Sequence, residues 1–115
     1  MSLVVIDRND VVLRGRLSAP AELRPLPSGD MLLVFKIVVR RENPRPRGPR
    51  SDVITCVSLL PAVQRYASAW TTDDVVEVEG SLQRRFWRTP TGTAVAYEVS
   101  CRRGRKIARA ASRSA

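Results

Sequence analysis

Three arginines surround two aromatic rings in one short run of this chain. Arg84, Arg85, Phe86, Trp87 and Arg88 follow one another without interruption. A guanidinium neutralises the phosphates of a nucleic-acid backbone, and a planar ring stacks on a base. The run therefore predicts contact with a single-stranded nucleic acid, whose phosphates and base faces are both accessible.

The positive charge is concentrated in two other segments. The 115 residues include 20 basic and 11 acidic side chains, which gives a net charge of +9. Segment 40–50 has five arginines and one glutamate, and segment 102–115 has six cations and no acid. Such clustering favours arms that track phosphates, and a solvated surface is the alternative. The arginines of the first segment that we expect to contact phosphates are Arg40, Arg41, Arg45, Arg47 and Arg50.

Groups that support catalysis or metal binding are scarce. The chain has no histidine, and its two cysteines, Cys56 and Cys101, are far apart in sequence. Asp73 and Asp74 have the character of a turn, with no second carboxylate cluster to assist them. We therefore expect a binding protein and no enzyme, without a metal, a cofactor or a small-molecule substrate.

The first ten residues lack the apolar length of a signal peptide, and no stretch is long enough for a membrane span. We expect a cytoplasmic, nucleoid-associated protein without a membrane partner. In that compartment Cys56 and Cys101 would both be reduced thiols.

Alternating apolar residues predict the elements that position these side chains. The predicted strands are 11–18, 31–39, 52–60, 75–87 and 94–101. Prolines and a Ser-Gly pair make 19–30 a connecting loop. A proline followed by apolar residues at helical spacing predicts a helix over 61–70, with Trp70 in the core.

Five strands with a helix between the third and fourth are the order of the OB-fold, an all-β, five-stranded barrel. We expect residues 1–101 to form this barrel and 102–115 to form a basic, disordered tail. Another small five-stranded barrel would use the same strands but would leave the helix unexplained. In an OB-fold, two loops flank the ligand, and here they would be 40–50 and 88–93.

Several blocks of the sequence resemble bacterial single-stranded DNA-binding proteins. They are VVLRGRL at 11–17, PAELR at 20–24, PSG at 27–29, SDVITCV at 51–57, VEVEGSLQRRFW at 76–87 and YEV at 97–99. The resemblance covers residues 9–101, in the family's order. It implies a homotetramer or a dimer that binds single-stranded DNA with little sequence preference, in replication, recombination or repair.

The resemblance also implies where bases stack. Trp87 falls on one aromatic position of the family, but two positions of the third strand fall on Val53 and Leu59, and the loop after the second strand has no ring. Stacking contributes about 1–3 kcal/mol per base, so three missing rings imply a weaker, salt-sensitive binder. Thr55 shares the face of Val53. The complete predicted nucleic-acid site is Arg40, Arg41, Arg45, Arg47, Arg50, Val53, Thr55, Leu59, Arg84, Arg85, Phe86, Trp87 and Arg88.

Alternatives to these interpretations stay open in the sequence. Trp87 could be buried between subunits, and Phe86 points to the opposite face. Family members that recruit replication partners have an acidic tail tip, whereas this chain stops at 113–115 with Arg-Ser-Ala, so we expect a short form without that tip. Residues 3–6 could pair across subunits. The alternative functions are a protein-interaction module similar to primosome-assembly proteins, and single-stranded RNA binding.

Overall fold

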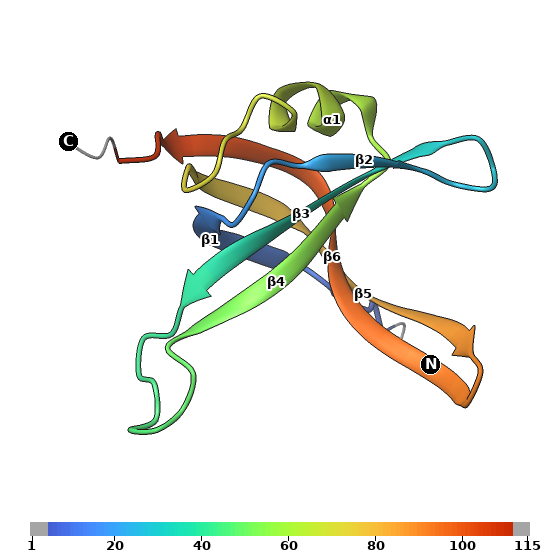
Figure 1. The fold of residues 1–115 in the computed structure, drawn as a ribbon, viewed down its shortest axis with the longest axis horizontal. Helices are drawn as coiled ribbons and strands as arrows, with labels where there is room; N and C mark the ends of the chain where they lie inside the picture. Colours follow the sequence, from blue (N-terminus) through green and yellow to red (C-terminus); the bar gives the residue numbers. More distant parts are fainter. Residues whose placement is uncertain (1–4, 112–115) are drawn as a thin grey trace.

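Strands β1 to β6 and one helix make up a twisted barrel in the computed structural model, which describes residues 5–111 (Figure 1). The strands are β1 (Val11–Leu17), β2 (Glu22–Pro25), β3 (Met31–Arg40), β4 (Ser51–Ser58), β5 (Val75–Thr89) and β6 (Gly92–Ala108). The helix α1 (Pro61–Ala67) lies between β4 and β5. The expected OB barrel with one short helix is confirmed.

The barrel closes through a second pairing of β1. The sheet order is β1-β5-β6-β4-β3-β2, and β1 also pairs with β3 at Arg16 and Leu17. Gly80 on β5 lies at a register shift against β6, where a β-carbon would collide with the backbone of Ser100. Only glycine allows this close approach, which bends β5 around the barrel.

Alternation along the strands separates a buried face from an open one. On β3, Leu33, Phe35 and Ile37 are buried, whereas Lys36 is exposed. The helix closes the barrel end with Val63 and Ala67. The predicted core position of Trp70 is confirmed, because its ring packs edge-on against Phe35 with centroids 5.6 Å apart. The buried cysteines Cys56 and Cys101 are both free thiols.

The predicted connecting loop over 19–30 is wrong in its middle. Residues 22–25 form β2, which pairs antiparallel with β3 from Glu22 opposite Val34 to Pro25 opposite Met31. Proline argued against a strand because it cannot donate to a ladder. β2 tolerates Pro25 because it is the edge strand and pairs on one side only.

The predicted start of a disordered tail at Arg102 is also wrong, because β6 continues to Ala108. The extension pairs with β5, as in Val76 opposite Lys106. The run of like charges suggested disorder, but carboxylates of Asp10, Glu77 and Glu79 pair with cations of this extension. Residues 112–115 lie outside the described part of the chain.

Two projections leave the barrel on the side away from α1 (Figure 1). One is the loop 41–50 between β3 and β4, hereafter the arginine loop. The other is the hairpin of residues 82–97 at the ends of β5 and β6, hereafter the hairpin arm. The expected loop 88–93 is reduced to Pro90 and Thr91, because the strands pair as far as Thr89 opposite Gly92.

Over residues 5–111, no helix combines the length and the apolar character needed to cross a membrane.

Candidate nucleic-acid interface

The outward side chains of five neighbouring strands form a hollowed surface, hereafter the outer face. β3 and β4 pair with Lys36 opposite Thr55, so both side chains are on the same side of the sheet. A hollow of about 210 Å³, the central hollow, lies over these strands. It is lined by Arg24, Leu32, Val34, Lys36, Thr55, Val57, Arg85 and Glu98. Three cations and one carboxylate therefore share it.

A second hollow, the side hollow, has a volume of about 380 Å³ and adjoins the first. Leu32, Val57 and Glu98 line both hollows. The side hollow also includes Leu59, which follows the end of β4 and is exposed. The two hollows together give the outer face one depression that apolar and polar side chains line jointly.

The hairpin arm adds an aromatic ring and a cation to the outer face. Arg85 and Trp87 are two residues apart on β5 and therefore share one side of the arm. The guanidinium carbon of Arg85 lies 4.7 Å from the centroid of the Trp87 ring, and 42% of Trp87 remains exposed. This geometry is suited to a cation–π contact and leaves indole surface for a base.

The other side of the arm repeats the same combination. Arg84 lies over the ring of Phe86, with 5.5 Å between the guanidinium carbon and the ring centroid. Leu82, Val95 and Tyr97 are also exposed there. The expectation that Phe86 and Trp87 face opposite ways agrees with the alternation of β5. The outer face thus gains Arg85 and Trp87, but not Arg84, Phe86 and Arg88.

The arginine loop is fastened at its base by one arginine. Arg41 donates two hydrogen bonds to the carboxylate of Asp52, at 3.0 and 2.6 Å. The hydrogen bond from Arg41 lowers the pKa of Asp52 below its usual value. The backbone N–H of Arg41 also donates to the carbonyl of Arg50 at 2.9 Å. Arg41 is therefore a structural anchor whose charge is already compensated.

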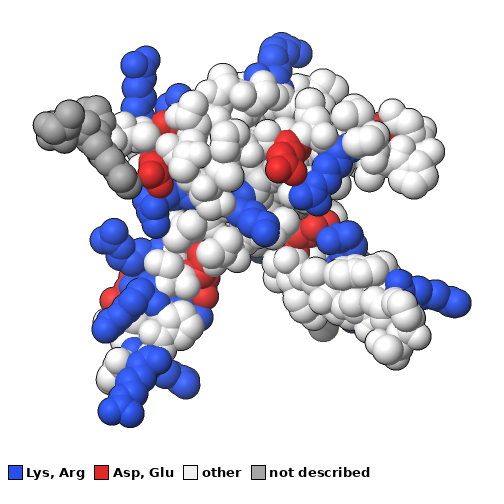
Figure 2. Space-filling view, viewed as in Figure 1, with Lys and Arg blue, Asp and Glu red and all other residues white. Residues whose placement is uncertain are grey.

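The remaining predicted cations of this segment have a different environment. These cations are Arg40, Arg45, Arg47 and Arg50. Among residues 5–111, none of the four forms an ion pair with a carboxylate. Figure 2 shows Lys and Arg side chains gathered on the lower-left projection, which Figure 1 identifies as the arginine loop. This projection therefore presents positive charge well away from the body of the barrel in that view.

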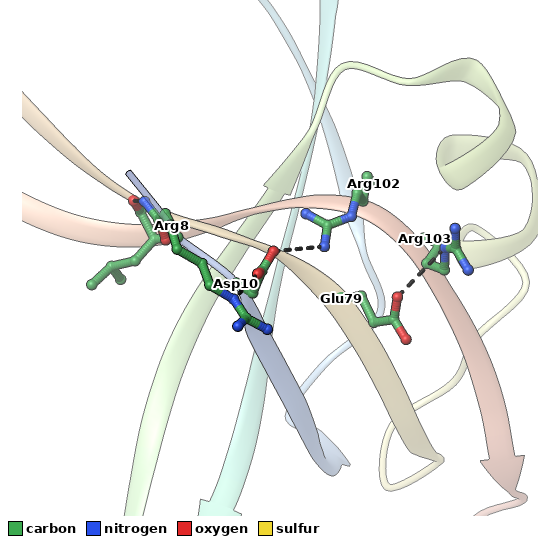
Figure 3. Close-up of polar contacts among 7 residues, drawn as sticks. Arg8, Asp10, Glu79, Arg102 and Arg103 are labelled. Atoms are coloured by element: carbon green, nitrogen blue, oxygen red, sulfur yellow. Dashed lines mark hydrogen bonds and ion pairs between the residues drawn. The ribbon is translucent and has the colours of Figure 1, made fainter. Parts of the chain in front are cut away.

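The cations of β6, by contrast, are paired with acidic residues of neighbouring elements. Arg102 lies 3.3 Å from a carboxylate oxygen of Asp10, and Arg103 lies 3.5 Å from Glu79 (Figure 3). Arg105 contacts Glu77 at 3.1 Å. Hydrogen bonds from Arg105 and then Arg14 lower the pKa of Glu77. These pairs tie β6 to the barrel, although Asp10 and Glu77 are each shared with a second arginine, Arg8 and Arg14.

The structure brings together some predicted site residues and separates others. Val53 and Thr55 lie on β4 of the outer face, and 61% of Val53 is exposed. Sequence reasoning missed Arg24, Lys36 and Glu98. Lys36 could have been found, because pairing the second and third predicted strands about their arginine-rich loop places it opposite Thr55. Arg24 could not, because it lies on β2, and the prolines of that segment argued against a strand.

Comparison with known proteins gives relatives of one kind, although no family model matches the chain. Single-stranded DNA-binding protein A of Bacillus subtilis is 33% identical over 88 residues, which cover 76% of this chain and 51% of the relative. Single-stranded DNA-binding protein 1 of Staphylococcus aureus is 33% identical over 95 residues, which cover 81% and 57%. The chain spans about half the length of the curated relatives it matches.

A solved structure has the same fold. It is described as a Plasmodium falciparum SSB complex with ssDNA, and it superposes with a TM-score of 0.72 at 21% sequence identity. The match covers 90% of this chain and 96% of that chain. The fold of this chain therefore follows a known architecture over most of its length.

Proposed function

Because this chain belongs to the family of bacterial single-stranded DNA-binding proteins, we propose that it binds and protects single-stranded DNA during replication, recombination or repair. One observation carries the proposal. The outer face lies between two projections. Within residues 5–111, the arginine loop presents arginines that form no ion pair, and the hairpin arm presents the exposed ring of Trp87 beneath Arg85. Phosphate neutralisation and base stacking are thus available on one surface.

In the proposed complex, the strand crosses the outer face from the arginine loop to the hairpin arm. Arg45, Arg47 and Arg50 contact phosphates at one end, and Lys36 contacts them over the central hollow. Trp87 stacks on a base at the other end. Val53, exposed on β4, supports a base or a sugar through apolar contact only. With one exposed indole, the complex depends strongly on charge and therefore on salt.

A fluorescence titration with oligo-dT across a salt series tests this proposal. Trp70 is buried and Trp87 is exposed, so quenching by a stacked base is expected from Trp87. Log affinity should fall by about 0.7 per neutralised phosphate for each log unit of salt. Trp87→Ala should abolish the quench and weaken binding, whereas Trp87→Tyr should keep most of the affinity because a ring remains.

Absence of binding at low salt would overturn the proposed function. A second candidate would then take its place, because Val53 and Leu59 are exposed apolar residues where the resemblance predicts rings. Such a surface fits a protein partner. That candidate would be supported if the nuclease-treated protein captured a replication protein and the Val53→Asp variant did not.

We propose further that identical barrels assemble through the side of the hairpin arm opposite Trp87. Leu82, Phe86, Val95 and Tyr97 are exposed there. The side chain of Asn9 exchanges two hydrogen bonds with the backbone of Leu82, at 2.7 and 2.8 Å, and so directs the N-terminal segment along the arm. Residues 3 and 4 of the predicted pairing segment lie outside the described residues.

Light scattering after size exclusion tests this assembly. A dimer or tetramer is expected, and Phe86→Glu should shift it toward the monomer because a buried, unpaired charge opposes association. Ala62→Glu adds the same single negative charge at an exposed position of α1, on the barrel end away from the hairpin arm (Figure 1), and should leave the assembly unchanged. A monomer at every concentration would contradict the assembly without affecting the proposed DNA binding.

A further inference from the structure

Glu98 occupies the middle of the outer face, where a carboxylate is unexpected in a surface for a polyanion. It lies on β6 and lines both the central hollow and the side hollow. Its side chain is only 11% exposed, and it faces three cations of the central hollow, Arg24, Lys36 and Arg85. The carboxylate repels a phosphate placed directly against it, so the cations around the central hollow suit the phosphates and Glu98 itself suits another part of a nucleotide.

The carboxylate of Glu98 has unused hydrogen-bonding capacity. Among residues 5–111, its one charged partner is Arg85, with 3.5 Å between Arg85 Nε and Glu98 Oε2, and no hydrogen bond to it is formed. That separation is longer than a good charge-assisted hydrogen bond. An ionised carboxylate accepts about four hydrogen bonds, and the Glu98 oxygens keep access to solvent, since the described residues hold no buried side-chain oxygen without a partner. Donors from a bound molecule would satisfy the carboxylate.

The edges of the four bases differ in the donors that they offer to a carboxylate. Guanine presents the ring N1–H and the exocyclic N2 amino group side by side, so that both can donate to the two carboxylate oxygens. Cytosine and adenine present one amino group beside a ring acceptor. Thymine presents a single N3–H between two carbonyl oxygens, which a carboxylate repels. A carboxylate in this position would therefore favour guanine.

On the basis of the proposed function, we propose that Glu98 is a specificity-determining residue that reads the edge of one base. The base enters the depression formed by the two hollows, and its N–H groups donate to the Glu98 carboxylate. Arg85 stays beside the carboxylate and neutralises its charge. Binding stays sequence-tolerant elsewhere along the strand, with a preference for guanine at this one position.

Competition between oligo-dT and the same oligomer with one central guanine tests the proposal. We expect the guanine to raise affinity about fivefold or more, in the range of a two-bond base contact. Inosine at the same place lacks the N2 amino group and should lose most of that gain. This comparison needs only the unmodified protein, so it does not depend on how a variant folds.

Two variants assign the effect to Glu98. Glu98→Gln should remove the guanine preference, because the amide presents one acceptor and a donor that opposes the guanine donors. Glu42→Gln removes one negative charge from the arginine loop and should raise the affinity for both oligomers equally while the preference persists. The retained affinity of Glu98→Gln for oligo-dT reports that the variant is folded.

Equal affinity for the thymine, inosine and guanine oligomers would overturn the inference and leave the proposed function intact. A guanine preference that survives in Glu98→Gln would also overturn it. Loss of affinity for all oligomers in that variant to the same degree would show that Glu98 only positions Arg85. Failure of the unmodified protein to bind oligo-dT would instead reject the proposed function itself.

Discussion

The guanidinium of Arg85 lies over the ring of Trp87, 4.7 Å from its centroid, on the side of the hairpin arm that continues the outer face. The same guanidinium lies 3.5 Å from Glu98 on the paired strand. A ring on one side and a carboxylate on the other restrain this long side chain before any ligand arrives. Such preorganisation reduces the entropy that binding would otherwise cost.

Arg85→Ala should therefore weaken oligo-dT binding more than Arg84→Ala does. Both arginines lie over a ring, but only Arg85 is on the outer face with Trp87. We expect a loss of about 1–2 kcal/mol for Arg85→Ala, from the phosphate and the cation–π contact together. Titration of each variant with oligo-dT at one fixed salt concentration measures the two losses of affinity. An equal loss for the two variants would show that the strand contacts both sides of the arm.

Neutralising the free cations of the arginine loop should reduce the salt dependence of binding. In the triple variant Arg45→Gln, Arg47→Gln, Arg50→Gln, the negative slope of log affinity against log salt should become less steep by about 2. Each lost phosphate contact contributes about 0.7 to that slope. Arg65→Gln alters an exposed arginine of α1, on the barrel end away from both projections (Figure 1), and should leave the slope unchanged. An unchanged slope in the triple variant would remove the loop from the binding surface.

The buried carboxylate of Asp74 should make stability fall in acid. It accepts backbone N–H groups of Thr71 and Ala110, each at 2.8 Å, and lies 3.1 Å from Lys106. The hydrogen bond from Thr71 is the main reason that the pKa of Asp74 is well below its usual value. A lowered pKa stabilises the fold above the unfolded-state value of about 4, and this contribution is lost as the pH falls below it.

Urea unfolding at several pH values checks this role. At pH 7, Asp74→Asn should be less stable by about 1–3 kcal/mol, because an amide accepts these bonds less well and leaves Lys106 unpaired. The difference from the unmodified protein should shrink between pH 5 and pH 2. A difference that does not depend on pH would mean that the loss comes from packing and that the charge of Asp74 is unimportant.

A methyl group at Gly80 should disrupt the barrel. Its β-carbon would collide with the carbonyl group of Ser100 on β6, and backbone atoms cannot move aside without breaking the ladder. Gly80→Ala should therefore cost several kcal/mol, by the overpacking and backbone effects that produce the largest losses. Gly48→Ala, whose new carbon would meet only Arg45 in the arginine loop, should change the urea midpoint little.

The patterns along the chain were sufficient for the fold class and for the central strands of the barrel. Apolar alternation defined β1, β3, β4 and β5, because a strand that covers a core must bury every second residue. The run of residues 84–88 identified an aromatic and cationic surface, since residue type alone limits what such side chains can bind. Trp70 was correctly assigned to the core from its helical spacing.

Tertiary structure decided which charges are available and which strands form at the margins. Arg41 and Arg105 look like other arginines in the sequence, but Asp52 and Glu77 compensate them across strands. β2 and the end of β6 form despite prolines and like charges, because pairing with β3 and β5 satisfies their backbone. Glu98 joins the outer face through contacts between residues distant in sequence, which no local pattern encodes.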